Sequence, residues 1–205
     1  MSRRIHSGGL YRDSGSRLHG HRGGLAQGAV CRAVVVVLCL CLFPLASAAQ
    51  VKDELAVKAA FVFNLTKYVE WPAGAAANEI VIGVTGEESM GLVLKQVLSG
   101  KTAGSKTVRV ILEPGKEELP HCNILYIAQP SPQKIRAILE RIPSTGILTV
   151  GDTASFTRLG GAVGLVTTGD HVQIQINPAA AEAAQIKISS RLLSLATLVN
   201  PTGGR

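Results

Sequence analysis

The sequence is poor in cysteine, in aromatic residues and in charge. Of its 205 residues, four are cysteine, 4 % are aromatic and 17 % are charged. Three of the cysteines (Cys31, Cys39 and Cys41) precede residue 49, so Cys122 is the one cysteine in residues 49–205. A single cysteine excludes an intramolecular disulfide there, and we expect the fold to depend on its hydrophobic core. The hydrophobic content of 46 % excludes an intrinsically disordered chain.

The main apolar run, residues 33–45, is shorter than the roughly 20 residues of a membrane-spanning helix. Arg32 precedes it and the small residues Ala46-Ser47-Ala48 follow it, which is typical of a cleaved signal peptide. We therefore predict a signal peptide at 1–48, a single domain at 49–205 and a periplasmic location. The alternative is an uncleaved membrane anchor. Residues 1–29 make an unusually long amino-terminal region, which a translation start nearer Val30 would explain.

Positive charge is concentrated at one end of the chain. Residues 1–48 contain six arginines and one acidic residue, whereas residues 49–205 contain 15 basic and 13 acidic residues. Nucleic-acid binding depends on clustered cations that neutralise phosphates. The near-neutral body therefore argues against a nucleic-acid partner.

Apolar periodicity predicts an α/β architecture after residue 52. Helices are expected over residues 53–70, 91–98, 132–141 and 178–198. Strands are expected over residues 80–84, 108–112, 123–128, 147–150, 161–168 and 172–176, the last two forming a hairpin around Gly169-Asp170. This order predicts a single domain with a mostly parallel mixed sheet flanked by helices on both faces.

Catalytic motifs are scarce in residues 49–205. His121, Cys122 and His171 do not have the spacing of metal ligands, and no G-x-S-x-G motif occurs. Lys95 stands where a phosphate-binding loop ending at Gly100-Lys101-Thr102 needs glycine. We therefore expect no enzymatic activity, no metal and no cofactor. The turn at residues 83–86 is either an ordinary strand-to-helix turn or a backbone site for an anion.

Three features each permit a structural and a functional interpretation. Cys122 is either a buried apolar residue or a redox thiol that forms intermolecular disulfides. Trp71, before Pro72, is either a lid on the core or an interface anchor. The segment from Phe156 to Gly160 and Gly161 is either a turn ended by a left-handed glycine or a loop that contacts a partner.

Several motifs, taken in order, resemble the YfiR/HmsC family of bacterial periplasmic proteins. The resemblance covers nearly all of residues 54–196 and is carried by FVFNLTKYVEWP (61–72), IGV (82–84), CNILYI (122–127), ILTVGD (147–152), Phe156 with Gly160-Gly161, Ile176-Asn177 and SSRLLSLA (189–196). The Cys122 region departs from the family pattern. His121 precedes the cysteine, whereas in the family a histidine commonly follows it, and the partner cysteines are missing, which puts redox control in doubt.

The resemblance implies a non-enzymatic regulator. Such a protein binds the periplasmic part of an inner-membrane diguanylate cyclase and represses it, which lowers cyclic di-GMP and biofilm formation. The resemblance also implies release by an OmpA-type outer-membrane lipoprotein and formation of a homodimer.

The last expected helix is the predicted centre of the partner contact. Its spacing places Ile186, Ser189, Ser190, Leu193 and Ala196 on one face and places Lys187 and Arg191 on another. The predicted partner-binding residues are Trp71, Phe156, Gly160, Gly161, Lys187, Ser190 and Arg191. The alternative is that this helix only packs against the sheet with a solvated basic edge.

A second functional class is a periplasmic small-molecule-binding or sensory domain. Ligands of α/β proteins bind at the carboxyl ends of parallel strands. In this sequence the corresponding crevice is expected near residues 83–86.

Overall fold

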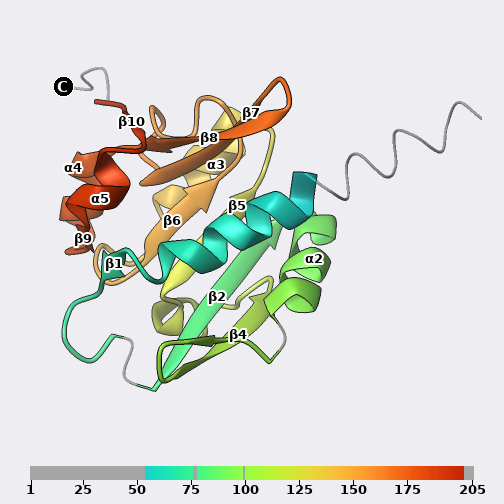
Figure 1. The fold of residues 1–205 in the computed structure, drawn as a ribbon, viewed down its shortest axis with the longest axis vertical. Helices are drawn as coiled ribbons and strands as arrows, with labels where there is room; N and C mark the ends of the chain where they lie inside the picture. The colour runs from blue at the N-terminus through green and yellow to red at the C-terminus, as the bar shows by residue number, and fades with distance from the viewer. Residues whose placement is uncertain (1–53, 76–77, 99, 201–205) are drawn as a thin grey trace, which may run out of the picture. The chain divides into compact units, whose positions relative to one another are not determined.

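The computed structural model describes residues 54–75, 78–98 and 100–200. These residues form an eight-stranded mixed sheet and the helices that cover it (Figure 1). The strand order is β10-β8-β7-β6-β5-β2-β4-β3. The strands are β2 (Glu79–Gly86), β3 (Thr102–Ala103), β4 (Lys106–Leu112), β5 (Ile124–Ala128), β6 (Leu148–Gly151), β7 (Val163–Thr168), β8 (His171–Ile176) and β10 (Thr197–Leu198).

Most neighbouring strands in this sheet are parallel, as the sequence predicts. The run β4-β2-β5-β6-β7 is parallel throughout, and β10 is parallel to β8. The β3–β4 and β7–β8 pairs are antiparallel, and the second of these is the predicted hairpin around Gly169-Asp170. The chain leaves β2 toward β4 and then crosses back to β5. The direction of winding therefore changes between β2 and β5.

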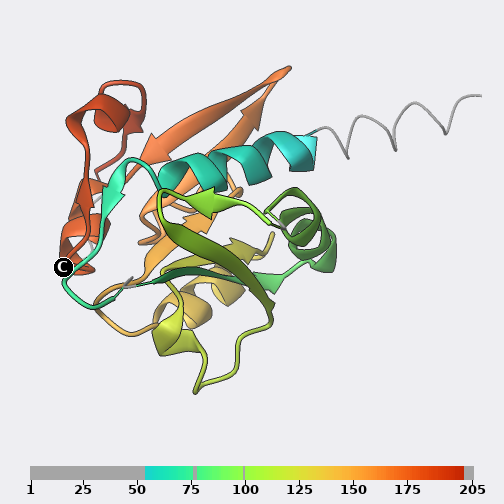
Figure 2. The same cartoon turned by 60° about the horizontal axis from the view of Figure 1, so that its bottom comes forward.

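Helices cover both faces of the sheet, which confirms the predicted fold class. All five residues of β5 are buried, so this strand needs apolar neighbours on both sides. A first helix over residues 54–65 packs with α2 (Glu88–Leu98) on one face through Ala59, Val62 and Leu94. On the other face, α3 (Pro132–Leu139) packs Ile135 against Leu125 and other core residues. Figure 2 shows the first helix and α3 on opposite sides of the sheet.

The first helix is shorter than the predicted 53–70. Its last turn tightens through bonds from the backbone N–H groups of Lys67 and Tyr68 to Asn64 O and Leu65 O, at 3.0 Å each. The chain then becomes extended before Pro72, as the residue preceding a proline prefers. Val69–Glu70 forms strand β1, which pairs antiparallel with β9 (Lys187–Ile188) in a separate two-stranded sheet.

The prediction of one long helix over residues 178–198 is wrong. This segment contains α4 (Pro178–Ala183), β9, α5 (Ser190–Leu193) and β10. Gln185 adopts a left-handed backbone conformation with a φ of 58°, which ends α4 and redirects the chain. The Ser189 side chain then caps α5 by accepting a hydrogen bond from Leu192 N. Lys187 and Arg191 consequently lie on different elements and not on one helical face.

The predicted signal peptide lies outside the described residues. Within residues 54–75, 78–98 and 100–200, no helix is long and apolar enough to cross a membrane. The same residues contain no group of three or more His, Cys, Asp or Glu side chains arranged to hold a metal ion.

Candidate partner interface

Trp71 is anchored at the end of β1 and remains half-buried. Its Nε1–H donates a hydrogen bond to Asn123 O at 3.0 Å. Asn123 is itself buried, accepts a hydrogen bond from Val81 N at 2.8 Å and donates one to Ala75 O. Beside the indole ring lies a hollow of about 390 Å³, whose lining includes Thr66, Glu70, Lys106 and Ala103. Trp71 therefore closes part of the core and also borders a surface hollow. Its role as an interface anchor stays a prediction.

The predicted residues Lys187, Ser190 and Arg191 lie next to the Trp71 segment. Lys187 is the register partner of Glu70 in the β1–β9 ladder, and Ser189 N donates to Tyr68 O at 2.9 Å. Lys187, Ser190 and Arg191 are all exposed. Strand pairing therefore brings two segments together that lie more than a hundred positions apart in the sequence.

Phe156 lies elsewhere and has a packing role. Its side chain is fully buried on the α3 face of the sheet. A Cβ atom at Gly151 would be 2.5 Å from Phe156 Cδ2, and one at Gly161 would be 2.1 Å from Cε1. Gly160 has a φ of 108° and supplies the left-handed turn. Phe156 and Gly161 are thus explained by close packing of the ring, and neither offers an exposed side chain to a partner.

Cys122 is also separate from this group. It is 2 % exposed, and its thiol donates to Glu118 O at 3.6 Å. Burial raises the pKa of the Cys122 thiol above its ordinary value. The neutral thiol is a poor nucleophile, so the geometry favours the packing role over the redox role.

A buried lysine, which the sequence analysis missed, fixes the first helix to the sheet. Lys58 is 5 % exposed, and its Nζ lies 2.7 Å from Glu54 Oε1 and 3.4 Å from Asp152 Oδ2. Glu54 also accepts a hydrogen bond from Thr167 at 2.6 Å. Tyr126 lies beneath this cluster, and burial raises the pKa of its hydroxyl. The sequence signal was a lysine on the face of the helix that otherwise carries Leu55, Ala59 and Val62.

The turn at residues 83–86 is occupied by a side chain of the same domain. The Glu113 carboxylate accepts hydrogen bonds from Gly86 N at 2.7 Å and from Thr85 Oγ1 at 2.9 Å. An external anion would have to displace this carboxylate. A groove of about 840 Å³ lies nearby on the α3 face. Its lining includes Thr85, Lys116, Leu119, Leu125, Ile138, Arg141 and Ile142.

A family model described as YfiR/HmsC-like matches residues 55–197. The match includes every strand of the sheet except the last residue of β10. The chain therefore belongs to the YfiR/HmsC-like family, as the sequence motifs indicate.

The other comparisons add little. No curated protein matches the chain significantly. Among solved structures, an ABC domain in complex with L-Trp from Streptococcus pneumonia has a TM-score of 0.45 and 10 % sequence identity. That match covers 67 % of this chain and 59 % of the other. A likeness of this size carries no argument about function.

Proposed function

We propose that this protein is a periplasmic regulator that binds an inner-membrane diguanylate cyclase and represses it. It acts by binding and has no chemistry of its own. Repression lowers cellular cyclic di-GMP and limits biofilm formation. The observation that carries the proposal is the family match over residues 55–197.

The geometry of the predicted contact residues supports this function. Trp71, Lys187, Ser190 and Arg191 come from two distant segments, yet the β1–β9 pairing places them on neighbouring elements. A half-buried tryptophan next to elements that carry an exposed lysine and an exposed arginine is consistent with a protein interface, because Trp and Arg are enriched there.

Deletion of the gene tests the proposal in the cell. Cyclic di-GMP and surface attachment are expected to rise in the deletion strain and to return when the wild-type gene is restored. The measurement requires a condition in which the cyclase is expressed. Unchanged cyclic di-GMP in that condition would contradict repression.

Export is part of the same proposal. The short apolar run and the Ala46-Ser47-Ala48 site support cleavage near residue 48. Mass spectrometry of the periplasmic fraction is expected to find an amino terminus between Ala49 and Val51. Recovery of the intact chain in the membrane fraction would instead support an uncleaved anchor.

Two further partners belong to the proposal because the family resemblance implies them. One is an OmpA-type outer-membrane lipoprotein, which would bind the regulator and release the cyclase. The other is a second copy of the chain in a homodimer. Sedimentation analysis of the purified protein, alone and with the lipoprotein, tests both.

A second candidate function is small-molecule sensing in the groove on the α3 face. Its lining is mostly apolar with a few polar groups, as in many ligand sites, and its volume of about 840 Å³ falls within their usual range. Substitution Leu119→Trp is expected to fill part of this groove. If it abolished signalling in the cell while leaving cyclase binding intact, sensing in the groove would be supported.

A further inference from the structure

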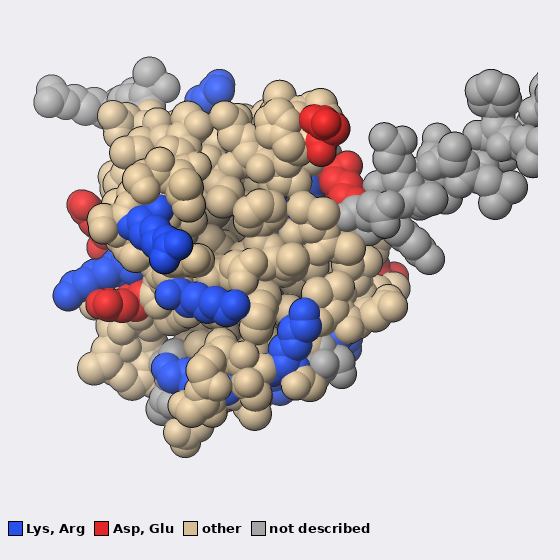
Figure 3. Space-filling model, in the orientation of Figure 1, with Lys and Arg blue, Asp and Glu red and all other residues tan. Residues whose placement is uncertain are grey.

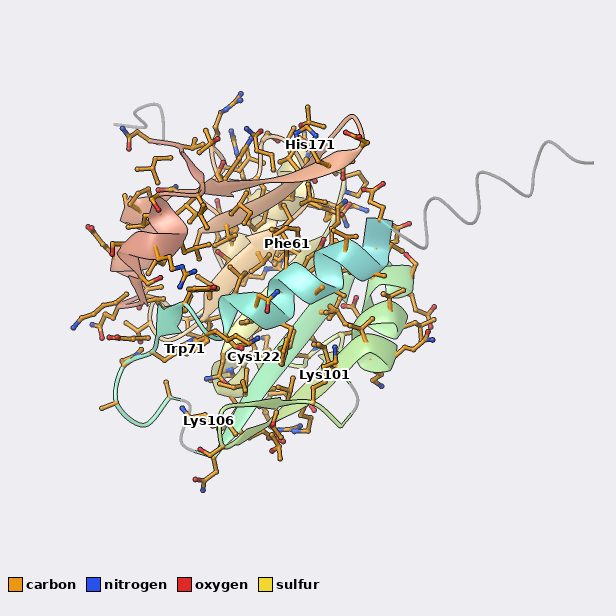
Figure 4. The ribbon with its side chains drawn as sticks, viewed as in Figure 1. Phe61, Trp71, Lys101, Lys106, Cys122 and His171 are labelled. Carbon is orange, nitrogen blue, oxygen red and sulfur yellow. The ribbon has the colours of Figure 1, made fainter. Side chains whose placement is uncertain are left out.

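Five cations lie on segments that line the hollow beside Trp71 or pair with its lining strand, and one of the five, Lys106, lines the hollow itself. We call Lys67, Lys101, Lys106, Lys187 and Arg191 the basic face. Lys106 lines the hollow, and Lys67 lies one residue beyond Thr66, which also lines it. Figure 3 shows Lys and Arg side chains across the middle and lower part of this side of the protein, with Asp and Glu mainly at its margins. In Figure 4, Trp71, Lys101 and Lys106 all lie below the first helix, with Trp71 and Lys106 toward the left and Lys101 toward the right.

Two of these cations are held over the same aromatic ring. Lys67 Nζ lies 5.1 Å and Lys101 Nζ 5.4 Å from the centroid of Phe63. Both distances are within the range of cation–π attraction. Lys67 also donates a hydrogen bond to Asn64 Oδ1 at 3.2 Å. The ring and the amide thus position two like charges close together at the surface.

The basic face is not neutralised within the domain. Among residues 54–75, 78–98 and 100–200, the ion pairs use Lys58, Arg109 and His171, and none uses a cation of the basic face. The segments that carry the face (residues 63–74, 100–106 and 187–193) contain a single acidic residue, Glu70. Carboxylates from a partner would relieve the repulsion between the neighbouring ammonium groups.

We propose that the basic face is the docking surface for an acidic segment of the partner protein, with Trp71 and Phe63 as its aromatic centre. This inference rests on the proposed function and identifies the chemistry of its partner. An anionic membrane surface is the competing occupant. A protein segment fits better because it can fill the hollow of about 390 Å³ and can provide a donor for Glu70, whereas anionic headgroups would be repelled by Glu70.

The test measures binding of the protein purified from its host to the full-length cyclase in nanodiscs of neutral phosphatidylcholine. For the wild type, Kd is expected to rise about tenfold between low and high salt, because exposed charges are screened. Lys67→Glu/Lys101→Glu is expected to weaken binding by at least about tenfold. Lys67→Gln/Lys101→Gln is expected to raise Kd by less, because it removes the two charges without reversing them.

The matched control is Lys134→Glu/Arg136→Glu, which reverses two exposed charges on α3, across the sheet. It makes the same change in net charge and is expected to leave Kd within about twofold of the wild type. The docking surface would be overturned if the Lys67/Lys101 and Lys134/Arg136 charge reversals weakened binding equally, or if neither Lys67/Lys101 variant changed Kd. The proposed function as a cyclase regulator would still stand in both cases. If the wild type itself does not bind the cyclase, the proposed function fails.

A second set of nanodiscs separates protein from lipid recognition. Empty nanodiscs rich in anionic phosphatidylglycerol are expected to bind the wild type weakly at physiological salt. The proposal would be overturned if the wild type bound these discs strongly and Lys67→Glu/Lys101→Glu lost that binding while it still bound the cyclase as the wild type does. The basic face would then be assigned to the membrane.

Discussion

At the scale of single residues, the ring of Phe156 occupies space next to two glycines that have no room for a side chain. Gly161→Ala is expected to destabilise the fold by about 3 kcal/mol, because its Cβ would be 2.1 Å from the ring. Phe156→Ala is expected to cost about 3–5 kcal/mol by leaving a cavity. Urea unfolding of each variant measures both values.

The double variant distinguishes close packing from independent effects. Gly161→Ala/Phe156→Ala is expected to lose less stability than the sum of the single changes, because the ring that the new Cβ meets is gone. Gly115→Ala is the control, since the nearest atom to a Cβ there would be Glu118 Oε2, at an ordinary contact distance of 3.7 Å. Additive losses in the double variant would contradict the packing role of these residues.

The thiol of Cys122 is expected to be protected in the folded protein. Because burial raises its pKa and the side chain is 2 % exposed, a thiol reagent is expected to react only as fast as the domain opens. Reaction kinetics at increasing urea concentrations measure this dependence. His121→Cys/Cys122→Ser moves the thiol to an exposed neighbour and is expected to react rapidly. Equally rapid reaction of the wild type would support a redox role.

At the scale of elements, the buried ion pairs of Lys58 hold the first helix on the sheet. The hydrogen bonds from Lys58 and then from Thr167 hold the pKa of Glu54 below its ordinary value of 4.5. This carboxylate therefore stabilises the fold fully above pH 4.5, and its contribution is lost as the pH falls through the lowered pKa.

The corresponding prediction concerns the acid side of the stability profile. The free energy of unfolding is expected to fall between about pH 5 and pH 3, and to fall less steeply in Glu54→Gln. Glu182→Gln removes an exposed carboxylate on α4 and is expected to keep the wild-type slope. Identical slopes for all three proteins would show that the Lys58 cluster does not anchor the helix.

The left-handed conformation of Gln185, which ends α4, predicts that glycine has opposite effects on stability at residues 184 and 185. Gln185→Gly is expected to stabilise the fold by about 0.5–1 kcal/mol, because glycine adopts the left-handed conformation without strain. Ala184→Gly, at a φ of −78°, is expected to destabilise it by a similar amount. Thermal unfolding of both variants measures the effect. Destabilisation by Gln185→Gly would argue for a continuous helix.

The sequence predicts elements where local pattern and burial agree. The β-branched runs of β2, β5 and β6 are recognisable because strands buried on both faces need continuous apolar residues. The segment after Pro178 misleads because PAAAEAAQ has high helix propensity and its left-handed residue is Gln185, where glycine is the usual signal. The pairing of Glu70 with Lys187 joins segments far apart in the sequence, so no local pattern could predict it.

The candidate interface was predictable only in part, because some of its residues are recognisable locally and others are brought together by tertiary contacts. Trp71 and Arg191 stand out as residue types within motifs of the sequence, and Lys187 stands out by its position four residues before Arg191. Lys67, Lys101 and Lys106 do not stand out, although Lys67 lies within the motif at 61–72, because a surface lysine is ordinary until the fold gathers several of them. Phe63 becomes informative only when two lysines from different segments are found over its ring.

At the scale of the whole molecule, one sheet separates two surfaces of different character. The basic face and the Trp71 hollow adjoin the first helix, whereas the groove lined by Leu119 and Ile138 lies beside α3. We expect the first surface to bind the cyclase. The second is then free to receive a small ligand, and the two functions need not exclude each other.

The most direct test of the central claim is the rate at which the full-length cyclase in nanodiscs forms cyclic di-GMP from GTP as this protein is added. We expect a saturable fall in that rate, and we expect heat-unfolded protein not to produce it. A rate that stays constant while bound complex is shown to form would contradict repression.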